Sequence, residues 1–180
     1  MADSASSVSL SPQLPGLEAL GEATQYAAQM NALIQRSPLF ENFNLAEVRL
    51  LSRFMTAYRA PQGSEVIREG EPGEFMMLLL EGSIAVFRRD RWNSQRLIAV
   101  LQPGHTVGEM SMIDGEPRFA TCVAEEPCLV TVLTREALAR IILEQPVLGA
   151  KILMELVLML SQRLRQTSQR LVSYMDREQS

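Results

Sequence analysis

Short apolar runs separated by glycine and proline dominate the middle of the chain, from Met55 to Leu101. These runs read TAYRA, SEVI, EFMMLLLEG, SIAVF and RLIAVL. Strands this short and this closely spaced are typical of a small antiparallel barrel or sandwich. Two more strands are predicted at Cys122–Ala124 and Leu129–Leu133. We therefore predict a mainly β fold with flanking helices, a β-roll or jelly-roll barrel with glycine at its corners.

The N-terminal part of the chain has a different pattern. Residues 1–14 are rich in Ser, Ala and Pro, which is typical of a disordered tail. Between Leu17 and Ile34 apolar residues recur near helical spacing, so we predict one amphipathic helix over residues 15–36. A second helix is predicted over residues 45–54, with Leu45, Val48, Leu51 and Phe54 on one face.

The C-terminal part is predicted to be helical. Thr134 suits the N-cap of a helix that runs through Leu143, and Pro146 suits the first position of a longer helix over residues 146–176. Along this helix a seam alternates steps of four and three residues: Leu153, Val157, Leu160, Leu164, Thr167, Leu171 and Tyr174. A heptad seam indicates a partner helix, so we expect a homodimer. The alternative is that the seam packs on the barrel of its own chain.

Composition and charge narrow the range of functions. The chain has 180 residues, of which 47% are hydrophobic, and its net charge is −4. An acidic chain of this kind does not favour a dominant nucleic-acid surface. The N-terminus lacks the basic and apolar regions of a signal peptide, and no run approaches the roughly 18 apolar residues of a membrane span. We therefore expect a cytoplasmic protein without membrane contact.

Metal binding and catalysis find little support in the sequence. Cys122 and Cys128 flank a predicted turn and can approach each other across a hairpin, but in a cytoplasmic chain we expect two reduced, buried thiols. Two cysteines and one histidine do not make a zinc site or an iron–sulfur site. No P-loop or paired nucleophile and base is visible, so we expect no bound metal and no enzyme activity.

The stretch from Gly108 to Thr121, GEMSMIDGEPRFAT, concentrates residues that suit a small anionic ligand. Glu109 precedes a short predicted helix, and Arg118 follows a turn. Backbone N–H groups at a helix start attract anions, and arginine can bind phosphate through two parallel hydrogen bonds. A carboxylate repels phosphate and is better suited to accept hydrogen bonds from hydroxyls. Together these residues predict a ligand that has both a phosphate and a sugar.

This stretch resembles the phosphate-binding cassette of the cyclic nucleotide-binding domain family, with matches at Gly108, Glu109, Ser111, Pro117, Arg118 and Ala120. The resemblance implies a cyclic nucleotide-binding β-roll over residues 37–145. It also implies that Glu109 binds the ribose 2′-hydroxyl and Arg118 the cyclic phosphate. The backbone around Met110 and Ser111 would complete the phosphate site.

One cassette position departs from the family pattern. Phe119 stands where Ser, Thr or Ala is usual, which removes a hydroxyl donor and adds bulk. We expect its ring to turn away from the site and pack in the core. The alternative is an altered or blocked site.

The long C-terminal helix is similar to the dimer helix of catabolite-activator-type members of this family, in which a Thr-Ser pair meets adenine. The resemblance implies that Thr167 and Ser168 read the exocyclic amine of the base, which favours cAMP over cGMP. No helix-turn-helix pattern follows this helix in the sequence, so we expect no direct DNA binding by this chain. The chain would then be either a free-standing sensor or a fragment of a larger regulator. We therefore predict a cAMP sensor that signals to an unknown downstream protein through its dimer helix. The alternatives are a ligand-free interaction domain and a sensor of another nucleotide such as cyclic di-GMP.

Overall fold

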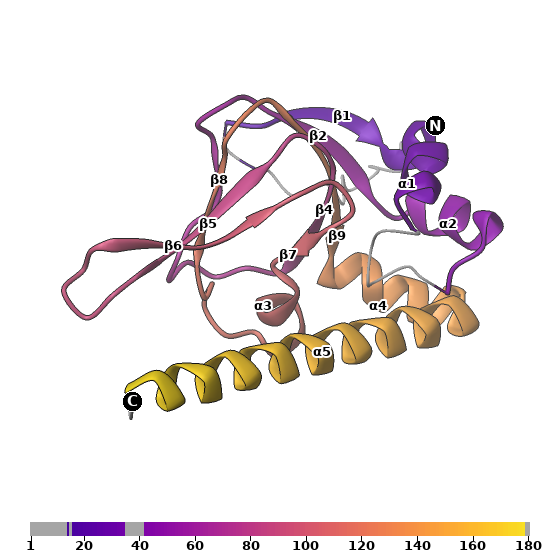
Figure 1. Cartoon of the computed structure of the whole chain (residues 1–180). Helices are drawn as coiled ribbons and strands as arrows, with labels where there is room; N and C mark the ends of the chain where they lie inside the picture. Colours follow the sequence, from indigo (N-terminus) through magenta and orange to yellow (C-terminus); the bar gives the residue numbers. More distant parts are fainter. Residues whose placement is uncertain (1–13, 15, 35–41, 179–180) are drawn as a thin grey trace, which may run out of the picture.

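Two antiparallel sheets form a β-roll, and helices cover one side of it (Figure 1). The computed structural model describes residues 14, 16–34 and 42–178. The first sheet has the strand order β1-β2-β9-β4-β7, and the second has the order β3-β8-β5-β6. The strands are β1 (Glu18–Glu22), β2 (Thr56–Ala60), β3 (Glu65–Ile67), β4 (Phe75–Glu81), β5 (Ile84–Arg89), β6 (Gln95–Leu101), β7 (Thr106–Val107), β8 (Thr121–Ala124) and β9 (Cys128–Thr134). The predicted β-roll is confirmed.

Strand β4 shows why a continuous apolar run forms part of this roll. Successive side chains of a strand point to opposite faces of a sheet. On β4, Met77 and Leu79 enter a core between the two sheets. The alternate residues, Met76, Leu78 and Leu80, enter a second core beneath the helices. The first sheet is therefore covered on both faces at β4, which explains the run of apolar residues along this interior strand.

The helices are the short η1 (Ala23–Tyr26), α1 (Ala27–Ile34), α2 (Leu45–Ser52), α3 (Glu109–Asp114), α4 (Arg135–Glu144) and α5 (Pro146–Glu178). Local capping begins two of them, and of the two caps the one at Thr134 is predicted by the sequence. The Asn44 side chain accepts a hydrogen bond from Glu47 N, and the Glu47 carboxylate accepts one from Asn44 N, which closes a capping box on α2. Thr134 caps α4 by accepting a hydrogen bond from Ala137 N at 3.0 Å.

The prediction of one helix over residues 15–36 is wrong in its first part. Residues Glu18–Glu22 form strand β1, which pairs antiparallel with β2 at the edge of the first sheet. Gly21 lies at an irregularity in this pairing with φ of 88°, a conformation incompatible with a right-handed helix. The helical pattern holds only from Ala27 onward. The predicted disordered tail lies outside the described residues except for Leu14, which packs against the core between the sheets.

Helix α5 runs along the helical side of the roll and extends beyond it (Figure 1). Its inner face buries Ile152, Leu156 and Met159, none more than 2% exposed. Lys151 Nζ donates to both carboxylate oxygens of Glu47 at 2.8 and 2.7 Å, which fixes the first half of α5 to α2. Within the described ranges, no helix combines the length and apolar character needed to cross a bilayer.

The predicted approach of the two cysteines across a hairpin is wrong. Cys122 lies on β8 in one sheet and Cys128 on β9 in the other, so the two strands are not paired. Both cysteines are free thiols and both are buried, as expected.

Candidate functional site

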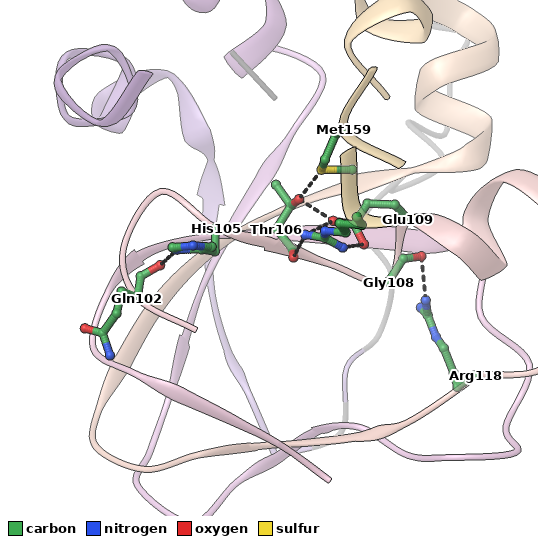
Figure 2. A network of polar contacts seen from close by, with 8 residues as sticks. Gln102, His105, Thr106, Gly108, Glu109, Arg118 and Met159 are labelled. Carbon is green, nitrogen blue, oxygen red and sulfur yellow. Dashed lines mark hydrogen bonds and ion pairs between the residues drawn. The ribbon is translucent and has the colours of Figure 1, made fainter. Parts of the chain in front are cut away.

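Arg118 is the central charged residue of the site. Its side chain is buried, with the residue only 4% exposed, just before β8. Nη1 donates a hydrogen bond to the Gly108 carbonyl at 2.9 Å (Figure 2). Nη2 donates one to the Phe75 carbonyl, also at 2.9 Å. The guanidinium also lies over the Phe75 ring, 4.2 Å from its centroid. These contacts hold the cation in one orientation.

Two glycines create the space that Arg118 occupies. A Cβ on Gly73 would lie 1.9 Å from Arg118 Nε and 2.1 Å from Cζ. A Cβ on Gly108 would lie 2.6 Å from Nη1 and 2.9 Å from the Phe75 carbonyl oxygen. Gly108 also has φ of 90°, in the left-handed region that favours glycine. The cation is therefore enclosed by backbone on two sides.

The charge of Arg118 has no acidic partner among the described residues. No carboxylate in that part of the chain forms an ion pair with its guanidinium, and its two hydrogen-bond acceptors are neutral carbonyls. Burial lowers the pKa of Arg118 from its ordinary value, while nearby Cys122 and Glu109 act in the opposite direction. A buried cation without an anion is energetically unfavourable, so the site is complementary to a negatively charged group.

Glu109 is the second buried charge, and it is paired. It is 2% exposed at the start of α3, and its Oε1 accepts a hydrogen bond from the Thr106 hydroxyl (Figure 2). Arg163 on α5 forms an ion pair with Glu109, with Nη2 3.3 Å from Oε1, and donates to the Thr106 carbonyl at 3.0 Å. The Met159 sulfur lies 3.3 Å from the same Thr106 hydroxyl. A ligand group that binds Glu109 would therefore lie next to the contacts between α5 and residues Thr106 and Glu109.

The far end of α3 is anchored by Arg135, the first residue of α4. Its Nε donates to the Met112 carbonyl at 2.7 Å and its Nη2 donates to the Ser111 carbonyl at 2.8 Å. The last carbonyls of a helix lack partners within the helix, and a cation there also compensates the helix dipole. Arg135 therefore fixes the short helix that carries Glu109.

The structure brings most of the predicted cassette residues together. Gly108 precedes α3, and Met110 and Ser111 lie in its first turn, with Met110 48% exposed and Ser111 buried. Ala120 is buried in the core between the sheets. The expected packing of Phe119 in the core is wrong, because the residue is 49% exposed.

Thr167 and Ser168 are not part of this cluster. Both are exposed on α5, and Thr167 lies one helical turn beyond Arg163. The Thr167 hydroxyl donates to the Arg163 carbonyl at 2.9 Å, a bond within the helix. In the described residues, no contact joins either side chain to the cassette.

Sequence reasoning missed three residues of the site. Gly73 was interpreted only as a corner residue, although it makes room for Arg118. Arg163 and Arg135 come from distant helices, and their spacing from the cassette gives no sequence signal. In the described part of the chain no group of three or more His, Cys, Asp or Glu side chains is arranged to hold a metal ion.

Comparisons with known proteins agree with this arrangement. The family model described as "Cyclic nucleotide-binding domain" matches residues 58–145, which include Glu109 and Arg118. A solved cyclic nucleotide-binding domain from Methylobacillus flagellatus is 35% identical, with a TM-score of 0.81, and the match covers 92% of this chain and 93% of that one.

Two matches come from Thermus thermophilus. The solved catabolite activator protein is 30% identical, with a TM-score of 0.70, over 77% of this chain and 63% of that one. The cyclic AMP receptor protein is 32% identical over 130 residues, which are 72% of this chain. This chain spans 58% of the receptor's length. From its fold, its site and its similarity over nearly the full length of a solved domain, the chain belongs to the cyclic nucleotide-binding domain family.

Proposed function

We propose that this chain is a cAMP sensor in which Arg118 binds the cyclic phosphate. The observation that carries the proposal is the buried Arg118 guanidinium without an acidic partner in the described residues. A cyclic phosphate carries one negative charge on oxygens that can accept hydrogen bonds from the N–H groups left free by the two carbonyl contacts. Such charge-assisted bonds are about twice as strong as neutral ones.

The sugar would bind at Glu109. Its carboxylate is an acceptor, and a ribose 2′-hydroxyl is a donor that suits it. The carboxylate already accepts from Thr106 and pairs with Arg163, so its position is set before the ligand binds. A preorganised acceptor of this kind avoids part of the ordering cost of binding.

The proposal that the base is adenine rests on a relative's name and on two residues of α5. The Thermus thermophilus relative is named a cyclic AMP receptor protein. In this chain, Thr167 and Ser168 lie exposed on α5, close in sequence to the Arg163 that contacts Glu109. We propose that they approach the adenine amine once ligand has bound and α5 has adjusted.

Helix α5 is the element through which occupancy would be transmitted. It contacts the cassette through the Arg163–Glu109 ion pair and through Met159 beside Thr106. A ligand hydroxyl at Glu109 changes the partners available to Arg163, and therefore the position that α5 prefers. Such coupling requires that cAMP bind more tightly to one position of α5 than to another.

We further propose that α5 forms a homodimer. The inner face of α5 is buried, and Leu160 of the predicted seam packs against the core of the same chain. The other apolar seam residues are exposed: Leu153, Val157, Leu164, Leu171 and Tyr174 are 41%, 62%, 69%, 60% and 64% exposed. An apolar row of this length on the outside of a helix indicates a protein partner. A second copy supplies the same row in a symmetric arrangement. The chain would then act as a non-catalytic regulator of a downstream protein.

Isothermal titration calorimetry of ligand-stripped protein with cAMP, cGMP and cyclic di-GMP tests the ligand. We expect cAMP to bind most tightly of the three nucleotides. Arg118→Gln should lower the affinity for cAMP about 30-fold or more, because the phosphate loses a buried charged partner. Arg59→Gln is the matched control, since the Arg59 side chain is 60% exposed. Unchanged affinity in Arg118→Gln would refute the site, and preference for another nucleotide would refute cAMP.

Light scattering coupled to size exclusion tests the dimer. We expect Leu164→Glu to give monomers, because a charge at the centre of the seam cannot be buried against a partner. Leu143→Glu is the control, because Leu143 is 81% exposed on α4, outside the seam. A wild-type monomer at high protein concentration would contradict the proposal.

A further inference from the structure

Arg88, on the second sheet, is a cation that the site described above does not use. It lies near the end of β5 and is half-buried. Its guanidinium stacks over the Phe119 ring, 3.6 Å from the ring centroid. Phe119 is the cassette residue that directly follows Arg118, so Arg88 contacts the cassette at the residue next to the buried arginine.

The strand geometry places Arg88 on the inner face of the roll. Ile84 and Val86 point into the core between the two sheets. Side chains alternate along a strand, and β5 pairs with β8 without a shift in register up to Phe87 opposite Thr121. Arg88 is therefore the next residue in the row that contains Ile84 and Val86, one position beyond the last residue of β5 that pairs with β8. A charged side chain at the end of an apolar row indicates that the row ends at a polar environment or a ligand.

The guanidinium of Arg88 has no acidic partner among the described residues. Its only described side-chain contact is the Phe119 ring. Directly opposite it on β6 stands Arg96, a like charge that is unfavourable in a cross-strand pair. Arg96 is neutralised by Asp90, with Nε 3.0 Å from Oδ2, but Arg88 is not. The N–H groups of Arg88 are available, and its charge is uncompensated.

The Phe119 ring explains how Arg88 is held in place. An arginine stacked on an aromatic face keeps the edge of its guanidinium plane free for hydrogen bonds. The ring is 49% exposed and takes no part in the core, so packing does not account for its position. Where Ser, Thr or Ala is usual in the cassette, this chain has a ring that positions a cation.

We infer that Arg88 is a second anion-binding arginine, held by Phe119, which contacts the phosphate of the bound cyclic nucleotide from the side of the second sheet. This inference rests on the proposed function, because it assumes a cyclic nucleotide at Arg118. Arg118 supplies a fixed, buried contact. Arg88 supplies a half-buried contact that is more sensitive to salt.

The hairpin between β5 and β6 offers a matched control. Its tip extends away from the roll (Figure 1) and carries a second stacked pair, with Arg91 3.9 Å from the centroid of the Trp92 ring. Arg91→Gln removes the same charge and the same type of stacking, but far from the cassette. Arg88→Gln and Arg91→Gln therefore remove the same charge and the same type of stacking, one from a half-buried residue that contacts the cassette and one from an exposed residue at the hairpin tip.

Calorimetric titration of the 180-residue chain with cAMP at low and high salt tests the inference. We expect Arg88→Gln to weaken cAMP binding about ten-fold at low salt, an effect between those of exposed and of buried charge pairs. The same substitution should reduce the salt dependence of the affinity. Phe119→Leu removes the ring, so Arg88→Gln should cost less in that background than in the wild type. Arg88→Lys should recover part of the affinity, because it keeps the charge and loses the stacking plane.

The outcomes separate this inference from the proposed function. If the wild type binds cAMP and Arg88→Gln matches Arg91→Gln in affinity and salt dependence, the role of Arg88 is overturned while the sensor remains. If the wild type binds no cyclic nucleotide, the proposed function is overturned and the role of Arg88 with it. Thermal melts followed by circular dichroism confirm that each variant is folded.

Discussion

Replacing Gly73 by alanine is the sharpest single test of how the site is built. Gly73 does not have a positive φ, so alanine meets no backbone strain there. The added methyl would nevertheless lie 1.9 Å from Arg118 Nε and 2.1 Å from Cζ. The optimum separation of non-bonded heavy atoms is about 3.5–4.0 Å, so the guanidinium must move by about 1.5 Å or more.

This displacement breaks the contacts that hold Arg118. Its bonds to the Gly108 and Phe75 carbonyls are both 2.9 Å, and a shift of this size takes them beyond hydrogen-bond range. Each bond from a charged donor contributes about 1.5–3 kcal/mol, but the displaced guanidinium regains water. We therefore expect a net loss of about 1–3 kcal/mol in the free energy of unfolding, which lowers Tm by several degrees in a chain of this length.

The effect on ligand binding should be larger than the effect on stability. An arginine that no longer points into the site loses a buried charged contact with phosphate, which costs about 2–5 kcal/mol. We expect cAMP affinity in Gly73→Ala to fall about 30-fold or more, measured by calorimetry, while circular dichroism shows a folded protein.

A double-mutant cycle separates this mechanism from general damage. In an Arg118→Ala background the methyl at residue 73 has no guanidinium to displace, so Gly73→Ala should change stability little. The two substitutions should therefore be strongly non-additive. Additive effects, or wild-type affinity in Gly73→Ala alone, would refute the argument that Gly73 makes room for the phosphate-binding cation.

Three further predictions concern the surroundings of the site. Arg163→Gln removes the ion pair to Glu109; because the Arg163 side chain is 40% exposed, we expect a loss of only about 1 kcal/mol in thermal melts, with Arg165→Gln as the control. Arg135→Gln removes the two donors that hold the end of α3, so we expect weaker cAMP binding by calorimetry in a protein that still folds. Burial raises the pKa of Cys122 to about 12, so the folded protein keeps this proton where the unfolded chain, with a thiol pKa near 9, loses it. Stability should therefore fall from about pH 9 to pH 12, by up to about 1.4 kcal/mol per pH unit from this thiol, and Cys122→Ala should fall less steeply in urea titrations.

Specific results would contradict each of these three predictions. Equal Tm values for Arg163→Gln and Arg165→Gln would show that the ion pair does not hold α5. Wild-type affinity in Arg135→Gln would show that α3 is fixed without this residue. A pH profile of Cys122→Ala parallel to that of the wild type would show that the thiol does not contribute to the alkaline loss of stability.

Many features of the fold could be predicted from the sequence because their causes are local. The apolar run of β4 predicts a strand, and Thr134 predicts the start of α4. The order of Glu109, the short helix and Arg118 predicted an anionic ligand with hydroxyl groups. Each of these inferences depends on residues within one turn, one strand or one loop.

The incorrect predictions occur where a local pattern fits more than one arrangement. Leu17 and Leu20 fit a helix, but the segment Glu18–Glu22 completes its backbone hydrogen bonds by pairing with β2, and Gly21 has a conformation that a helix excludes. Phe119 was expected in the core because it is large and apolar. In the structure its ring is half exposed and lies against Arg88 of β5 instead.

The sequence alone therefore determined most of the strands after Met55, the starts of α2, α4 and α5, and the chemical character of the cassette. The tertiary structure alone showed that Gly73 makes room for Arg118, that Arg163 pairs with Glu109 and that Arg135 fixes α3. The physical reason is that spacing along the chain reports only neighbours within a few residues. Contacts between distant residues depend on how sheets and helices pack, and those contacts decide which charges in this site are compensated and which remain available for a ligand.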